Sequence, residues 1–169
     1  MKHDHADEII ARWRHELPQL PPLPLQVAKR VARLEALLDA ASGGELAKLG
    51  ITRAEYMVLA TLRRVGRPYR LKPSELTTSA LLSSGGTSNV VKRILDAGYV
   101  RRHENPNDGR STWVELTSEG LRVAEAAIKR SVAAHEALLA KVPAQKVQAL
   151  SDMLRHVLVA LGDGVDPPG

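Results

Sequence analysis

The sequence predicts a mainly α-helical fold that carries one small β-hairpin. In most of the 169-residue chain, apolar residues recur at the three- and four-residue spacing of helices. Only residues 99–103 and 111–116 are predicted as strands, and the turn-forming sequence NPNDG lies between them. Two short helices, one from Pro73 and one that ends at Gly98, come directly before this hairpin. That order of elements predicts a winged helix-turn-helix module flanked by terminal dimerisation helices.

The amino-terminal part is predicted to form two helices separated by prolines. Residues 7–17 (DEIIARWRHEL) place apolar side chains at helical spacing, and Trp13 is among them. Four prolines within residues 18–24 then end this helix and form a short, stiff connector. A second helix is predicted from Leu25, with a weaker pattern at residues 42–44 (SGG).

The helices of the module have local signals at their ends. Thr52 and Glu55 have the spacing of a capping box and begin a helix that Gly66 stops. Residues 67–71 are predicted as an extended link into the helix near Pro73, because proline suits a first helical turn. The following helix is capped by one of two adjacent serines.

Two further helices are predicted after the hairpin. Thr117 and Gly120 open a long helix, and Pro143 starts the last one. The broad apolar faces of the terminal helices predict a homodimer, since helix-turn-helix proteins usually read two half-sites about a two-fold axis. The alternative is that these helices simply cover the core of a monomer.

Four segments follow from this pattern. Residues 1–50 hold an extra amino-terminal helix, the proline-rich connector and a first dimerisation helix. Residues 51–117 form the winged helix-turn-helix DNA-binding domain, and residues 118–162 form the carboxy-terminal dimerisation helices. Residues 163–169 are predicted to be a disordered tail.

Positive charge is concentrated in the module. Residues 62–110 contain ten Lys and Arg against four Asp and Glu, a net charge of +6, whereas the whole chain has +5. The rest of the chain therefore carries −1. Charge confined to one module is typical of polyanion binding. With only 3% aromatic residues, single-strand binding through stacked bases is not expected.

Composition and motifs exclude several other classes. The chain has no cysteine, which excludes disulfides, thiolate metal sites and thiol catalysis. Because it lacks the nucleophile-elbow, P-loop, zincin and dinucleotide motifs, it is not predicted to be an enzyme, and no cofactor is expected. Asp152 and His156 lie four residues apart, but a surface pair is commoner than a metal site at that spacing, so no metal is predicted. No apolar run reaches membrane length and the first residues do not form a signal peptide, so a cytoplasmic location with no membrane contact is expected.

Several of these segments together resemble the MarR family of bacterial transcriptional regulators. The resemblance covers about residues 24–161 and is carried by TRAEYMVLATL, PSELTTSALL, SSGGTSNVVKRILDAGYVRR and NPNDGRSTWVELT. The sequence DGR followed by VELT is the family's wing signature. Two features depart from the family pattern: Asn105 stands where Asp is more usual, and Gly85-Gly86 lies at the start of the recognition helix.

The resemblance implies a homodimer that binds a specific sequence in double-stranded DNA, most often as a repressor. Members commonly leave a pseudo-palindromic operator when a small anionic or phenolic effector binds between the module and the terminal helices. Residues 84–97 would form the recognition helix in a major groove, and residues 104–110 the wing on the flanking minor groove. An alternative from another class is a winged-helix protein–protein interaction module without specific DNA binding.

Six polar residues of the recognition helix are predicted to face DNA. They are Ser84, Thr87, Ser88, Asn89, Lys92 and Arg93. Hydroxyl groups near the helix start suit phosphate oxygens, whereas Asn89 could pair with adenine and Arg93 with guanine. The alternative is a solvated helix face with a capping serine.

Residues outside the recognition helix complete the predicted site. By resemblance, Arg110 reaches into the minor groove, and Asp108 holds its guanidinium and closes the turn. Arg101 and Arg102 lie on opposite faces of their strand, so at most one of them meets a phosphate. Trp13 is placed like a Trp that lines the effector pocket in some members, and the alternative is an apolar anchor for the extra helix. Further candidates for DNA-backbone contacts are Arg67, Arg70 and Lys72.

Overall fold

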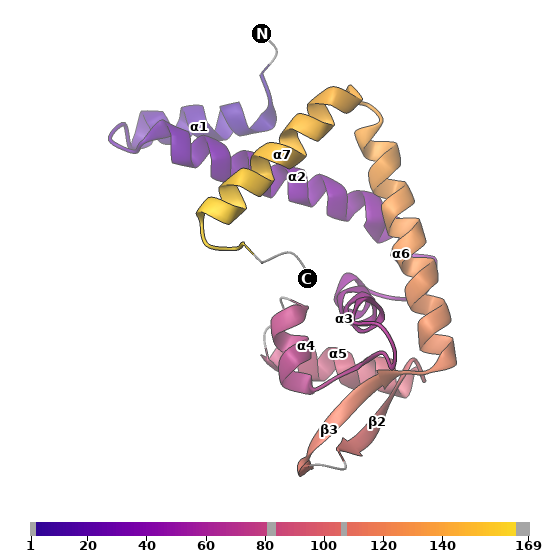
Figure 1. Ribbon diagram of the computed structural model, residues 1–169. Coiled ribbons are helices and arrows are strands. Elements are labelled where there is room, and N and C mark those ends of the chain that lie inside the picture. Colours follow the sequence, from indigo (N-terminus) through magenta and orange to yellow (C-terminus); the bar gives the residue numbers. More distant parts are fainter. Residues whose placement is uncertain (1–2, 81–83, 106–107, 165–169) are drawn as a thin grey trace.

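The computed structural model describes residues 3–80, 84–105 and 108–164, and for residues 84, 104, 105 and 108–111 it describes the backbone alone. The helices are α1 (His5–Glu16), α2 (Pro22–Ala47), α3 (Arg53–Arg64), α4 (Pro73–Ser79), α5 (Ser84–Asp96), α6 (Ser118–Leu139) and α7 (Ala144–Ala160). The strands are β1 (Arg70–Leu71), β2 (Val100–Asn105) and β3 (Asp108–Leu116). Figure 1 shows α1, α2 and α7 at one end, α3 to α5 and the sheet at the other, and α6 connecting the two ends.

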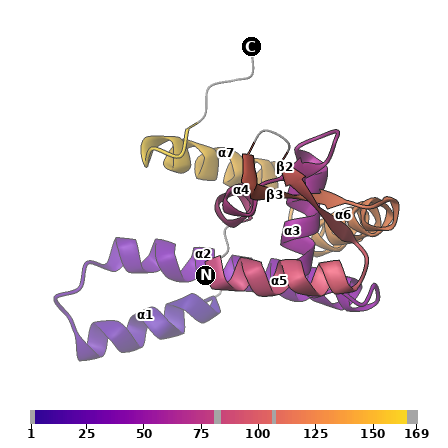
Figure 2. The same ribbon diagram turned by 90° about the horizontal axis from the view of Figure 1, so that it is seen from below.

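The first two helices form a hairpin in which α1 packs along α2 (Figures 1 and 2). At the start of α1, Asp4 Oδ1 accepts a hydrogen bond from the Asp7 backbone N at 2.9 Å, and Asp7 Oδ2 accepts one from the Asp4 N at 3.0 Å. α2 begins at Pro22, three residues before the predicted start at Leu25. The first turn of a helix does not use its N–H groups, so Pro22 and Pro24 are accommodated there rather than in the connector.

α2 also continues through the two glycines at which a weaker pattern is predicted. Gly43 and Gly44 lie within the helix, and their neighbours Ser42 and Leu46 are buried. This part of the chain packs along α6. Burial on that side offsets the entropy that glycine loses inside a helix.

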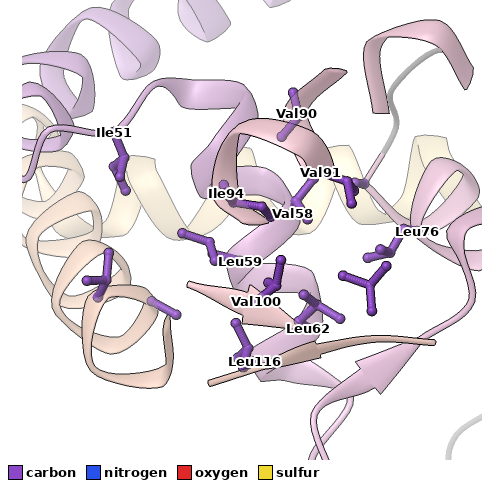
Figure 3. Packing of buried hydrophobic residues seen from close by; sticks show 14 of the residues in the cluster. Ile51, Val58, Leu59, Leu62, Leu76, Val90, Val91, Ile94, Val100 and Leu116 are labelled. Carbon is purple, nitrogen blue, oxygen red and sulfur yellow. The ribbon is translucent and has the colours of Figure 1, made fainter. Parts of the chain in front are cut away.

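The hydrophobic core lies in the module around α3, between α5, the sheet and α6 (Figure 3). Val58, Leu59 and Leu62 of α3 are fully buried. The capping box at its start is confirmed: Thr52 Oγ1 accepts from the Glu55 N at 3.3 Å, and Glu55 Oε2 accepts from the Thr52 N at 2.6 Å.

The sheet has three antiparallel strands in the order β1-β3-β2. Two of them are the predicted hairpin, in which Val100 pairs with Leu116. The third is β1, within the stretch predicted only as an extended link, and its Arg70 pairs with Glu115. A two-residue strand depends on its partner strand, which local composition does not show.

α6 begins directly against the base of the hairpin. Its capping residue Thr117 accepts from the Gly120 N at 3.0 Å, as the sequence predicts for a helix opening there. Thr117 also donates from its own N to the Tyr99 O at 3.0 Å and from Oγ1 to the Gly98 O at 2.8 Å. These bonds join the long helix to the wing strands.

α7 is the least buried helix of the protomer. It begins after Pro143, as predicted, and none of its residues is buried. The predicted disordered tail falls mostly on residues 165–169, which lie outside the described residues. No helix in the described ranges is long and apolar enough to cross a membrane.

Candidate nucleic-acid interface

The predicted recognition helix, α5, has one buried face and one exposed polar face. Val91 and Ile94 lie in the core, and the chain leaves the helix through Gly98, whose φ of 74° favours glycine. On the opposite side Asn89 and Lys92 are exposed. This arrangement presents two hydrogen-bonding side chains on a helix that is fixed from behind.

Not all six residues predicted to face DNA lie on the exposed face. Ser88, Asn89, Lys92 and Arg93 are exposed, whereas the Ser84 side chain lies outside the described residues. Thr87 is only 2% exposed, which differs from the prediction. The physical reason is helical spacing, because Thr87 precedes the buried Val91 by four residues and therefore shares its face.

Arg93 is engaged with the core helix α3. Its Nε lies 3.1 Å from Glu55 Oε1, and the Glu55 side chain is only 8% exposed. The same carboxylate caps α3 through Oε2. The Arg93 side chain, predicted to pair with guanine, therefore also fixes α5 to α3, and its remaining guanidinium nitrogens lie on a side chain that is 61% exposed.

A cleft lies beside the recognition helix, where α4, α5 and β2 meet. Its volume is about 240 Å³. Its lining consists of Pro73, Ser74, Thr77, Thr87, Ser88, Val91 and Arg102. Hydroxyl groups and one guanidinium dominate its polar lining.

The adjacent arginines of β2 occupy different environments. Arg102 lines the cleft beside α4 and α5. Arg101 instead donates from Nη2 to Glu115 Oε1 at 2.5 Å, and His103 Nε2 lies 2.9 Å from the other oxygen of the same carboxylate. The two arginines are thus directed to different surroundings, as strand alternation requires.

Sequence reasoning missed the role of Trp113 in β3. The guanidinium of Arg70 lies 5.1 Å from the Trp113 ring centroid, and Lys72 Nζ lies 5.6 Å from it. Two of the cations predicted to contact the DNA backbone are therefore placed together by one aromatic side chain. A Trp next to the buried Val114, and hence on the other face of the strand, is the sequence signal for such a platform.

The tip of the wing is described only through its backbone. Asp108 and Arg110 belong to β3, and Asp108 pairs with Asn105 across the hairpin. The predicted roles of the Asp108 and Arg110 side chains fall outside the described residues.

Trp13, the candidate effector-pocket residue, is 42% exposed on α1. A cavity of about 390 Å³ lies between α1, α2 and α7, and Trp13 does not line it. Ala6 and Ile10 are the buried residues of α1. The choice between a pocket role and an anchor role for Trp13 therefore stays a prediction.

An ion-pair cluster holds the start of α1 on α2. Arg30 donates from Nε to Asp4 Oδ2 at 2.9 Å and from Nη2 to Asp7 Oδ1 at 2.6 Å. The pKa of Asp7 is lowered from its ordinary value, first by the hydrogen bond from the Asp4 backbone and also by Arg30. The pKa of Arg30 is raised, chiefly by its hydrogen bond to Asp4.

In the described ranges, no group of three or more His, Asp or Glu side chains is arranged around one point. At the candidate pair with His156, Asp152 accepts instead from Gln148 Nε2 at 3.1 Å and from Arg155 Nη1 at 3.0 Å. The Asp152 side chain is therefore part of a surface hydrogen-bond cluster.

The terminal helices expose many large apolar side chains. We define the terminal apolar surface by its most exposed large residues. These are Leu23, Val27 and Val31 of α2, and Met153, Val157, Leu158 and Val159 of α7, together with Leu161. An apolar groove of about 610 Å³ between α2, α6 and α7 adjoins this surface. Exposed patches of this kind mark interaction sites.

Comparison with known proteins gives matches to transcriptional regulators. A family model described as "MarR family" matches residues 49–111. The HTH-type transcriptional regulator PecS of Dickeya dadantii (strain 3937) is 28% identical over 152 residues, which are 90% of this chain and 92% of PecS. The multiple antibiotic resistance protein MarR of Salmonella typhimurium is 30% identical over 114 residues, which are 67% of this chain and 77% of that protein.

Solved structures show the same fold. Sco5413, a MarR family transcriptional regulator from Streptomyces coelicolor, superposes with a TM-score of 0.72 at 25% identity, over 85% of this chain and 98% of that one. A mutant MarR from E. coli, complexed with operator DNA, superposes with a TM-score of 0.70 at 24% identity, over 86% of this chain and 97% of that one.

Proposed function

This chain belongs to the MarR family of transcriptional regulators, which are not enzymes, and from this premise we propose that it is a homodimeric, cytoplasmic repressor of transcription. It binds a pseudo-palindromic operator in double-stranded DNA. A small anionic or phenolic ligand releases it from that operator.

The observation that carries the proposal is the exposed polar face of α5. Asn89 and Lys92 are exposed there, while Val91 and Ile94 of the same helix are in the core. A helix held in this way can enter a major groove as a rigid unit, and the net charge of +6 over residues 62–110 attracts the phosphate backbone. The relative solved with operator DNA shares this fold, which supports the same mode of docking.

The wing completes the proposed interface. Residues 104–110 lie on the flanking minor groove, where Arg110 meets the negative potential of a narrow A·T-rich track. Arg110→Ala should therefore weaken DNA binding and reduce its salt dependence. An unchanged salt slope would remove Arg110 from the minor groove.

Dimerisation is supported by the terminal apolar surface. Leu23 is 67% exposed and Met153 is 62% exposed in the protomer, and no residue of α7 is buried. A second copy that covers this surface would bury it and place two recognition helices about a two-fold axis. Half-site centres about 10 bp apart are then expected.

The ligand part of the proposal is supported by the cavity between α1, α2 and α7. It is mostly apolar, has a volume of about 390 Å³, and has Asp4, Arg30 and Arg33 among its lining residues, of which Arg30 is already paired with Asp4 and Asp7. This volume suits a small molecule with an apolar body, and Arg33 is the cation proposed to meet an anionic group of the ligand. Small aromatic carboxylates and phenols, added to the DNA complex, should lower the fraction of DNA bound.

Selection of bound sequences from random duplex DNA, followed by a salt titration on the winning sequence, tests the proposal. A two-fold symmetric site that binds one dimer is expected. Salt-sensitive binding without any enriched sequence would contradict sequence-specific regulation. Absence of binding to duplex DNA at low salt would favour the protein–protein interaction module.

Two substitutions in α5 separate base recognition from helix positioning. Asn89→Ala should relax base preference at one position of each half-site, at a cost of about 1–3 kcal/mol for the preferred base. Arg93→Ala should in addition lower the free energy of unfolding, because it removes the partner of Glu55. If Asn89→Ala weakened DNA binding equally on every sequence, this would show that Asn89 contacts phosphate instead.

A further inference from the structure

We propose that the cleft between α4, α5 and β2 holds one phosphate of the DNA backbone, and that Arg102 supplies the charge that neutralises it. This inference rests on the proposed function. It assigns a backbone-positioning role to one arginine of β2 and withholds that role from its neighbour Arg101.

The chemistry of the cleft suits a phosphate. Its seven lining residues include one guanidinium, no carboxylate and four hydroxyl groups, of which that of Thr77 already donates to the Pro73 O at 3.0 Å. Arg102 makes no ion pair with any residue in the described ranges, so its charge is not compensated within that part of the protomer. Thr87, which is 2% exposed, is a buried member of this lining.

The position of the cleft favours contact with the DNA backbone rather than with the edge of a base. Thr87 and Val91 belong to the buried face of α5, so the cleft lies on the flank of the helix. Ser88 also lines the cleft, and the exposed Lys92 lies four residues after it, so the cleft borders the exposed polar face of α5. When the exposed face meets base edges in the major groove, the strand beside the helix brings its phosphates to the flank.

Arg101 provides a matched control on the adjacent residue. Both arginines are exposed and belong to β2, but the Arg101 guanidinium is bound to Glu115 at 2.5 Å. The Glu115 carboxylate already compensates its charge. Removing Arg101 should therefore lower the number of counterions released on DNA binding by less than removing Arg102 does.

The first measurement is DNA affinity against salt concentration for the parent, Arg102→Gln and Arg101→Gln. Arg102→Gln should reduce the slope of log K against log salt by about 1 and should weaken binding about 10-fold on specific and random DNA alike. Arg101→Gln should keep the slope of the parent. Equal slopes for the parent and Arg102→Gln, with the parent still binding DNA, would overturn the inference.

The second measurement locates the phosphate. Single phosphates of the operator are replaced by neutral methylphosphonates, one position at a time. One position per half-site should weaken the parent but leave Arg102→Gln unaffected, because both changes remove the same contact. Additive effects at every position would overturn the inference.

Two controls keep the result interpretable. Urea unfolding of Arg102→Gln should match that of the parent, since the side chain is exposed; a destabilised variant would show that Arg102 has a structural role instead. In a titration at constant ionic strength without DNA, inorganic phosphate should not bind saturably in this cleft. Saturable binding of inorganic phosphate, together with an unchanged DNA salt slope, would assign the cleft to a free anion. If the parent itself does not bind duplex DNA, the proposed function fails first.

Discussion

Replacing Gly120 with alanine should destabilise the protein, although alanine is the better helix former. Gly120 lies in the first turn of α6, where the helix meets the base of the wing strands. A Cβ atom at this position would lie 1.7 Å from the Tyr99 carbonyl oxygen and 2.7 Å from its carbonyl carbon. Real Cβ contacts essentially never fall below 3.0 Å, so the helix and strand must separate by about 1.3 Å.

The magnitude follows from the hydrogen bonds at this junction. Thr117 donates to Tyr99 O and to Gly98 O, and Gly120 N donates to Thr117 Oγ1. Disrupting three bonds at about 1 kcal/mol each costs about 3 kcal/mol. The higher helix propensity of alanine returns about 1 kcal/mol, which leaves a loss of about 2 kcal/mol in the free energy of unfolding.

Urea unfolding followed by circular dichroism measures this loss, and Gly43→Ala is the matched control. Gly43 also lies inside a helix, but a Cβ there would meet nothing within 4 Å. Gly43→Ala should therefore stabilise the protein by about 0.5–1 kcal/mol. The two substitutions are expected to have opposite signs. A Gly120→Ala variant as stable as the parent would refute the steric argument.

Three further predictions concern the terminal helices. Arg30→Ala should speed hydrogen exchange throughout α1, because Asp4 and Asp7 lose their partner; unchanged exchange would show that apolar contacts alone hold the helix. Since the pKa of Asp7 is lowered in the folded state, its contribution is fully present above the ordinary value of 3.8 and is lost as the pH falls through the lower folded value. Exchange in α1, corrected for the intrinsic rate, should thus stay constant from pH 7 to 5, and an increase in that range would contradict the assignment. Met153→Glu should shift the dimer to a monomer in sedimentation velocity without unfolding it, because the side chain is 62% exposed in the protomer; an intact dimer would place the interface elsewhere.

Local chemistry explains why most helix ends could be predicted from the sequence. The capping residues Thr52 and Thr117 act within three residues of their partners, so their spacing alone identifies them. Because proline breaks helices, Pro22 is predicted to lie in the connector. In the structure it lies in the first turn of α2, where proline does not break a helix. The position in the helix decides which of these two effects applies.

Contacts between distant segments could not be predicted in the same way. The strand at Arg70 exists only because Glu115 lies opposite it, and the bond between Arg93 and Glu55 joins two helices across the module. Neither pair has a characteristic spacing in the chain. Thr87 is a different case, because helical periodicity places it on the buried face although its side chain is polar, and its contact with DNA stays a prediction.

The first turns of α6 are fixed in the module by the hydrogen bonds at Gly120 and by Val123, Ala124 and Ala127 in the core. The 22 residues of α6 span about 33 Å at 1.5 Å per residue. A rotation of the module and α6 together by about 5° would therefore displace the far end of the helix by about 3 Å. Small changes in how the terminal helices pack are geometrically equivalent to small rotations of the whole wing module. Affinity for DNA can change through the angle between the module and the terminal helices.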